Sequence, residues 1–281
     1  MKSAIERQPF THQGLIARWG LSLVAVAAFA TLSACTSTKS QTVASVSNAP
    51  VAELAPVDPK RRAQIRLELA AEYFQAGRFK VATEEVGQAL AADPNYADAY
   101  GLLGLILMQQ RDFPKADAAL RKALDLKPND GNLIHNYAWM LCQQKHFAEA
   151  DQWFDKAIAQ PGYEERSKSL MAKGLCYQQA GNLERAKQAL LAAYEMDLNN
   201  PMIAYNLANV SWLSGDANKA QFYIRRLNRT QGANAETLWL GIKIERAMRD
   251  DIAMRQLVQQ LRERYPDSRQ WHAYERSAFD E

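Results

Sequence analysis

A 34-residue pattern that recurs along the chain restricts its fold more than any other feature of the sequence. The clearest copy runs from Ala97 to Asp130. Its small and apolar residues recur at helical spacing on two segments, with Tyr100, Leu103, Gly104 and Leu107 on the first and Phe113, Ala116, Leu120 and Ala123 on the second. A polar turn separates the segments. Two such short helices cannot bury their apolar faces against each other alone, so they need neighbours of the same kind.

Five further copies supply those neighbours, and together the six cover about residues 61–268. The residues in step are Ala70, Ala82 and Ala89; Ala138, Ala150 and Ala157; Gly174, Ala186 and Ala193; Ala208, Ala220 and Leu227; and Leu238, Met254 and Leu261. The fourth copy resumes at Ser167 after two extra residues in the segment 160–166. The sixth drifts by one residue, because Gly241 and Ala253 fit better one step over.

This arrangement of small, aromatic and proline positions at a period of 34 residues resembles the tetratricopeptide repeat, or TPR. The resemblance implies an all-α fold, a right-handed superhelical solenoid of six helix-turn-helix repeats. A generic helical bundle would not keep so constant a period. Gly104 and Gly174 are expected where the two helices of a repeat cross, because close packing of helices needs small residues there. Residues 267–281 are expected to cover the apolar end of the last repeat.

Composition agrees with a helical body that has a sizeable core, since 48% of the 281 residues are hydrophobic and 23% are charged. The formal net charge is only +3, so nothing in the charge balance demands a nucleic-acid partner. Arg225, Arg226 and Arg229 form one local basic cluster, which we interpret as a solvated helix face.

No catalytic or metal-binding motif stands out. The four histidines are scattered, the spacings typical of metal ligands are missing, and neither a phosphate loop nor a nucleophile elbow is found. We therefore predict a protein that is not an enzyme and that needs no metal, cofactor or small-molecule substrate. The sequence also offers no evident acid/base pair, which disfavours a glycan-processing enzyme.

The first 34 residues have the features of a secretory signal, with a basic start, an apolar run over 21–32 and small residues at the end. The run is too short to cross a bilayer of roughly 30 Å as a permanent helix. The end, Leu32 to Cys35, resembles the bacterial lipobox. That resemblance implies cleavage before Cys35 and lipidation of its thiol, and Thr36 then implies the outer membrane, with the body in the periplasm. An ordinary signal peptide followed by a chance cysteine is the alternative.

Residues 35–59 are rich in Ser, Thr, Ala and Pro and poor in large apolar groups, so we expect a flexible tether that joins the lipidated end to a TPR domain at 60–281. Within that domain, Cys142 and Cys176 lie 34 residues apart, on the first helices of neighbouring repeats. Those helices pack side by side, and an oxidising compartment favours a disulfide between them. Two buried free thiols are the alternative.

The TPR resemblance also implies which residues face a ligand, because the first helices of the repeats line the inner groove of such arrays. In the third and fifth repeats these positions give Asn132, His135, Asn136, Trp139 and Gln143, and Tyr205, Asn206, Asn209, Trp212 and Leu213. Asn can donate to and accept from a peptide backbone, and Trp and Tyr supply rigid contact area. We predict a groove for a peptide or helix of a partner protein.

A lipobox, a Ser/Thr/Ala tether and six TPRs resemble the type IV pilus biogenesis and stability lipoproteins of the PilF/PilW pilotin family. The phrases NLIHNYAWMLCQQKHFAEADQWFDKAI and NLANVSWLSGDANKAQFYIRRLN carry much of this resemblance. It implies a pilotin that binds the type IV pilus secretin and promotes its outer-membrane localisation and multimerisation. An outer-membrane TPR lipoprotein that scaffolds cell-wall enzymes is the alternative.

Overall fold

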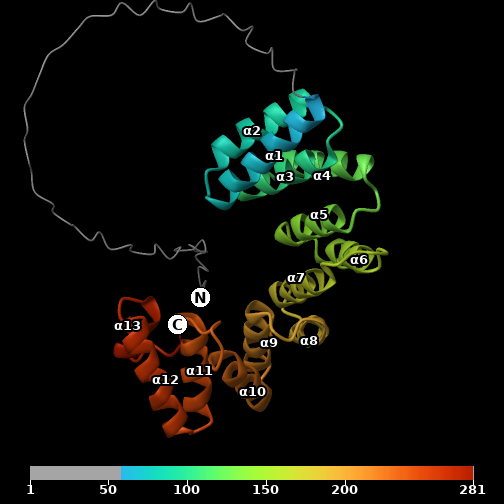
Figure 1. Cartoon of the computed structure of the whole chain (residues 1–281). Helices are drawn as coiled ribbons and strands as arrows, with labels where there is room; N and C mark the ends of the chain where they lie inside the picture. Colours follow the sequence, from blue (N-terminus) through green and yellow to red (C-terminus); the bar gives the residue numbers. More distant parts are fainter. Residues whose placement is uncertain (1–57, 281) are drawn as a thin grey trace, which may run out of the picture. The chain divides into compact units, whose positions relative to one another are not determined.

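The computed structural model describes residues 58–280, and the regular structure within this range is α-helical (Figure 1). The helices are α1 Pro59–Gln75, α2 Phe79–Ala92, α3 Ala97–Gln109, α4 Phe113–Leu126, α5 Gly131–Gln143, α6 Phe147–Ile158, α7 Arg166–Gln179, α8 Leu183–Met196, α9 Pro201–Leu213, α10 Ala217–Asn228, α11 Ala235–Ala247, α12 Asp251–Arg264 and α13 Arg269–Glu275. The predicted all-α class is confirmed. The first twelve helices form six pairs, one for each copy of the pattern.

Aspartate and asparagine side chains begin many of these helices. Asp58 caps α1 by accepting a hydrogen bond from the backbone N–H of Arg61 at 3.4 Å. The side chain of Asn200 caps α9 by accepting from the two backbone N–H groups of Met202 and Ile203, at 3.1 and 3.3 Å. Side-chain caps of this kind also begin α4, α5, α8, α10, α11 and α12. Each is worth about 1 kcal/mol, so the polar turns of the sequence position the helices.

The turn inside each pair contains one residue in the left-handed backbone region. These residues are Gly77, Arg111, Lys145, Gly181, Gly215 and Arg249, with φ between 56° and 82°. They recur every 34 residues, except for a step of 36 between the third and fourth repeats. The recurring turn geometry thus follows the sequence period and shows the two-residue insertion directly.

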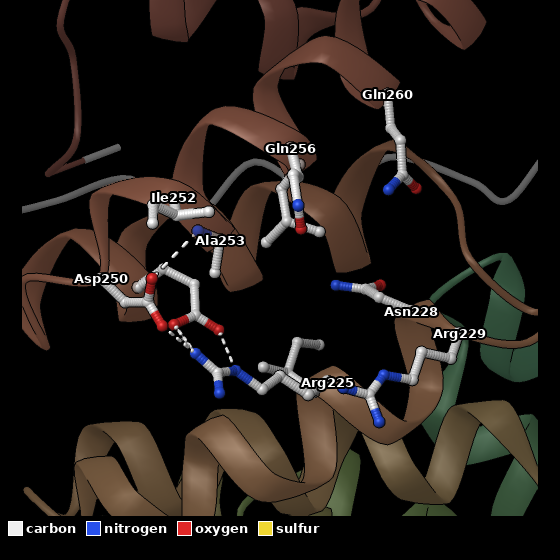
Figure 2. Close-up of a pocket in the computed structure, with 11 residues that line it drawn as sticks. Arg225, Asn228, Arg229, Asp250, Ile252, Ala253, Gln256 and Gln260 are labelled. Atoms are coloured by element: carbon white, nitrogen blue, oxygen red, sulfur yellow. Dashed lines mark hydrogen bonds and ion pairs between the residues drawn. The ribbon is translucent and has the colours of Figure 1, made fainter.

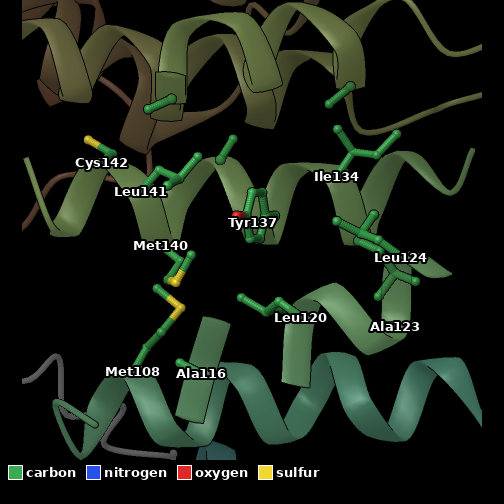
Figure 3. Close-up of a cluster of buried hydrophobic side chains, with 14 of the residues drawn as sticks. Met108, Ala116, Leu120, Ala123, Leu124, Ile134, Tyr137, Met140, Leu141 and Cys142 are labelled. Atoms are coloured by element: carbon green, nitrogen blue, oxygen red, sulfur yellow. The ribbon is translucent and has the colours of Figure 1, made fainter. Parts of the chain in front are cut away.

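Small residues allow the two helices of a pair to approach closely, as predicted. A Cβ atom added to Gly104 of α3 would lie 2.5 Å from Cγ of Leu120 in α4. One added to Gly174 of α7 would lie 2.7 Å from Cγ of Leu190 in α8. Real Cβ contacts are longer than this, so either glycine is fixed by the crossing that it makes possible. Leu120 belongs to the buried cluster that Figure 3 shows between α3, α4 and α5.

The pairs stack in chain order, each helix contacting the next one along the chain. The odd-numbered helices from α1 to α11 also contact one another in succession, whereas within residues 58–280 no even-numbered helix contacts the next even-numbered one. The odd helices therefore line the tighter side of the stack and the even helices the splayed side. This is the arrangement of a solenoid, with the core running between the pairs.

The insertion between the third and fourth repeats packs a tyrosine into the joint. Tyr163 is only 6% exposed, and its ring lies so close to Gly131 that an added Cβ would be 2.5 Å away. Arg166 then closes the turn by donating to the carbonyl oxygens of Ile158 and Gln160, both at 2.9 Å. The extra residues therefore fill the space between α5 and α7.

The last helix, α13, packs against α11 and α12. The ring of Phe279 stacks on that of Trp239 in α11, with centroids 5.3 Å apart, and Trp271 stacks on Tyr274 at 5.6 Å. Leu261 of α12 is fully buried in the same cluster. Aromatic side chains thus cover the end of the sixth pair.

The predicted signal sequence, the lipidation residue Cys35 and the tether up to Val57 lie outside the described residues. Asp58 and Pro59, placed at the end of the tether by the sequence, are the cap and the first residue of α1. In the part of the chain that the structure describes, no helix combines the length and apolar character needed to cross a membrane.

Candidate partner-binding surface

The exposed sides of the odd helices form one continuous surface, because each of these helices contacts the next. We call the stretch on α3, α5, α7 and α9 the odd-helix surface. All nine residues predicted to contact a partner lie on α5 or α9. These two helices do not touch each other, but both contact α7. The predicted residues are therefore parts of one surface only if α7 joins them.

On α5, the structure leaves four of the five predicted residues accessible. Asn132 is exposed, and Asn136, Trp139 and Gln143 are half-buried. Trp139 packs with its inner side against the core cluster of the second and third repeats. A half-buried indole anchored in this way can present its other side to a partner with little loss of side-chain freedom.

His135 is the exception, and its prediction as a groove residue is wrong. It is only 7% exposed, and its Nδ1 is hydrogen-bonded to Oγ of Ser169 at 2.9 Å. The same Oγ is hydrogen-bonded to the hydroxyl of Tyr163, also at 2.9 Å. Burial, together with the charge of Lys168, lowers the pKa of His135 from 6.5 to about 4. The inserted tyrosine and α7 cover this position, which in a repeat of standard length would face solvent.

On α9, the fifth repeat presents a mixed polar and aromatic set. Tyr205, Asn206, Asn209 and Trp212 are all half-buried. The amide Nδ2 of Asn206 donates to the carbonyl oxygen of Met202 at 2.8 Å, so its Oδ1 faces outward as an acceptor. Burial raises the pKa of Tyr205, which therefore stays neutral at physiological pH. The exposed residue Leu213, which also occupies a predicted groove position, follows at the end of the helix.

Sequence reasoning missed the residues that connect these two sets. On α7, Met171 and Leu175 occupy the same repeat positions as His135 and Trp139 and are half-buried. On α3, Leu102 and Leu105 are half-buried as well. The signal was available, since the repeat frame that selects Trp139 also selects Leu175. The odd-helix surface is thus apolar along α3, α5 and α7 and becomes richer in amides at α9.

The third and fourth repeats are held together across this surface. Cys142 of α5 and Cys176 of α7 form a disulfide, with their Cα atoms 5.8 Å apart, which is an ordinary separation for such a bond. On the other side of α7, Nζ of Lys173 contacts Oδ1 of Asp151 at 2.9 Å and Oδ1 of Asp155 at 2.5 Å. Both aspartates belong to α6. Covalent and ionic contacts therefore fix α7 to the preceding repeat.

The described residues offer no alternative centre for chemistry. Within residues 58–280, no group of three or more His, Cys, Asp and Glu side chains is placed to hold a metal ion. The basic cluster is partly different from its interpretation as a solvated face. Nε of Arg225 donates to Oε1 of the fully buried Glu245 at 2.6 Å, whereas Arg226 and Arg229 are exposed.

Comparison with known proteins identifies the repeats. Tetratricopeptide-repeat family models match residues 67–131, 107–174 and 167–200. The type IV pilus assembly protein PilF of Pseudomonas aeruginosa is 28% identical over 218 residues, which are 78% of this chain and 86% of that protein.

Solved structures agree. The structure of Pseudomonas aeruginosa PilF has a TM-score of 0.65 at 26% identity, over 78% of this chain and 99% of that one. That of PilW, described as a widely conserved type IV pilus biogenesis factor, has a TM-score of 0.67 at 28% identity, over 75% of this chain and 97% of that one. The repeat fold and these relatives suggest a non-catalytic scaffold. The chain is therefore a TPR solenoid protein of the PilF/PilW family of type IV pilus biogenesis proteins.

Proposed function

We propose that this protein is a lipid-anchored pilotin, which binds the type IV pilus secretin in the periplasm and promotes its localisation and multimerisation in the outer membrane. The observation that carries the proposal is the match to PilF, which extends over most of both chains rather than over single repeats. A solenoid of TPRs shared with unrelated proteins would support only the fold, whereas a match of this length includes the order and number of the repeats.

The odd-helix surface is the part of the molecule suited to the partner. It is continuous, because α3, α5, α7 and α9 contact in succession, and it is rigid, because Cys142 and Cys176 join two of these helices. Its apolar centre, formed by residues such as Leu105, Trp139 and Leu175, matches an apolar side of a partner helix or strand. Asn206 and Asn209 offer hydrogen bonds at one end.

Lipidation at Cys35 supplies the second half of the proposed mechanism. A lipid-modified protein that holds the secretin carries it along when the anchor is moved to the outer membrane. Three acyl chains, each CH₂ contributing about 0.8 kcal/mol when buried, would hold the complex firmly in the bilayer.

The test is a deletion strain that carries either the native gene or the Cys35→Ala variant. We expect the native gene to restore surface pili and secretin multimers in the outer-membrane fraction. The variant should bind the secretin but leave its multimers depleted in that fraction. Normal secretin multimers in the deletion strain would contradict the proposal, and co-purification of cell-wall enzymes instead of the secretin would favour a scaffold for those enzymes.

A further inference from the structure

A cleft between α10 and α12 lies on the even helices, away from the odd-helix surface. The two helices do not contact each other, and both pack on α11. The space between them is a cavity of about 440 Å³ (Figure 2). Its labelled lining residues include Asn228 and Arg229 from the end of α10, and Gln256 and Gln260 from α12. We call this cavity the outer cleft.

One end of the outer cleft is a rigid wall of charges that already neutralise one another. Nη2 of Arg225 donates to Oε2 of Glu245 at 2.6 Å and to Oδ2 of Asp250 at 2.7 Å. Gln221 donates to the same Oε2 at 2.8 Å. Glu245 is fully buried, so these bonds are needed to keep its carboxylate inside the protein. This wall therefore shapes the cleft and leaves Arg225 with no capacity for a ligand carboxylate.

The other end contains two groups without a partner. Oδ1 of Asn228 is buried and accepts no hydrogen bond, the one such side-chain atom found in residues 58–280, while its Nδ2 donates to the carbonyl oxygen of Thr237 at 3.0 Å. A buried acceptor left unpaired is costly, by about 1–3 kcal/mol, and calls for an N–H donor. Arg229 is exposed and forms no ion pair with any described residue. It calls for an anion.

The remaining lining is apolar or carries amides. Ile252 is 66% exposed at the rim, and Leu257 and Ile224 lie deeper. A free phosphate would satisfy Arg229 but would neither donate to Asn228 nor cover Ile252. A peptide backbone offers the N–H group, an acidic side chain offers the carboxylate, and an adjacent apolar side chain covers Ile252.

We propose that the outer cleft binds an extended acidic segment of a partner protein, with Arg229 pairing a carboxylate and Oδ1 of Asn228 accepting a backbone N–H. This partner contact is additional to the one proposed for the odd-helix surface. Because the two lie on different sets of helices, the protein can hold both segments at once and act as a bridge between them.

The test uses the full-length protein in detergent micelles and three fluorescein-labelled peptides with blocked ends. Each peptide alternates valine with one polar residue, which is glutamate, glutamine or lysine, and binding is followed by fluorescence anisotropy. We expect the glutamate peptide to bind about fivefold more tightly than the glutamine peptide, the effect of roughly 1 kcal/mol from one partly exposed ion pair. The lysine peptide should bind most weakly.

Variants locate the binding. Arg229→Gln should abolish the preference for glutamate over glutamine, whereas Arg226→Gln, a matched change on the other side of α10, should leave it intact. Ala253→Phe should fill the cleft and weaken binding of every peptide, and a melting curve checks its fold. Absence of binding, equal affinity for the three peptides, or a glutamate preference that survives in Arg229→Gln would each overturn the proposal, even if Ala253→Phe failed to fold.

Discussion

Gly104 shows how a single residue sets the distance between two helices. Because its added Cβ would meet Leu120 at 2.5 Å, we expect Gly104→Leu to destabilise the fold by at least about 2 kcal/mol through overpacking. Gly87, in the middle of α2, has nothing within 4 Å of its added Cβ, so Gly87→Ala should be neutral or stabilise by up to about 1 kcal/mol. Urea unfolding measures both. A Gly104→Leu protein as stable as the native one would contradict the observed crossing.

His135 makes stability depend on pH in a defined direction. Burial, and then Lys168, lower its pKa from 6.5 to about 4 in the folded protein. The unfolded chain therefore takes up a proton first, and the contribution of the neutral, buried ring is present above pH 6.5 and is lost as the pH falls toward 4. At about 1.4 kcal/mol per pKa unit, the full loss is roughly 3 kcal/mol.

Urea unfolding at pH 7.5 and pH 4.5 tests this dependence. The native protein should lose roughly 2–3 kcal/mol more than His135→Asn over this interval, since the variant has no ring to protonate. The exposed His146 provides the control, because His146→Asn should follow the native protein. Identical losses in the native and His135→Asn proteins would show that the ring is not buried.

Some residue contacts were beyond prediction from the sequence. Glu245 lies in the pattern of the sixth repeat as one more polar position, and its burial depends on Arg225 reaching it from the preceding repeat. His135 is covered by Tyr163, which belongs to an insertion that interrupts the period. The repeat frame describes what each repeat shares, so it cannot predict contacts that exist at only one joint.

At the scale of helices, the period predicted much more. Each copy became one helix pair, the glycines at 104 and 174 became close crossings, and the insertion became the single step of 36 residues between turns. The drift of the sixth copy is physical as well. There the close approach shifts to Gly241, whose added Cβ would lie 2.8 Å from Nδ2 of Asn228 and 2.9 Å from Leu257.

The joint between α5 and α7 should depend on its disulfide. Cys142 and Cys176 are 0% and 4% exposed, and their bond closes a loop with a sequence separation of 34 residues. A loop of this size typically gains about 2–4 kcal/mol from the crosslink. We expect the double variant Cys142→Ala with Cys176→Ala to lose that amount in urea unfolding.

Reductant separates the crosslink from the packing of the two side chains. It should destabilise the native protein but leave the double variant unchanged. Equal stability of the native protein with and without reductant, with the thiols shown to be free in the reduced sample, would contradict a structural role for the bond.

At the scale of the whole molecule, the solenoid separates binding surfaces by helix parity. The odd helices contact in succession and give a continuous surface, while the even helices stand apart and leave clefts between them. A partner segment on α3 to α9 and a second one between α10 and α12 would not compete. This separation suits a protein that joins components of an assembly rather than one that transforms a substrate.

The most direct test of the account is co-purification of the secretin with tagged, full-length protein from detergent-solubilised membranes. Trp139→Ala combined with Trp212→Ala removes two aromatic contacts from the odd helices, and Phe222→Ala removes one from α10, where that ring is 60% exposed. We predict that the double variant loses the secretin, while Phe222→Ala retains it. Full retention of the secretin by the double variant would contradict the assignment of the odd-helix surface as its binding site.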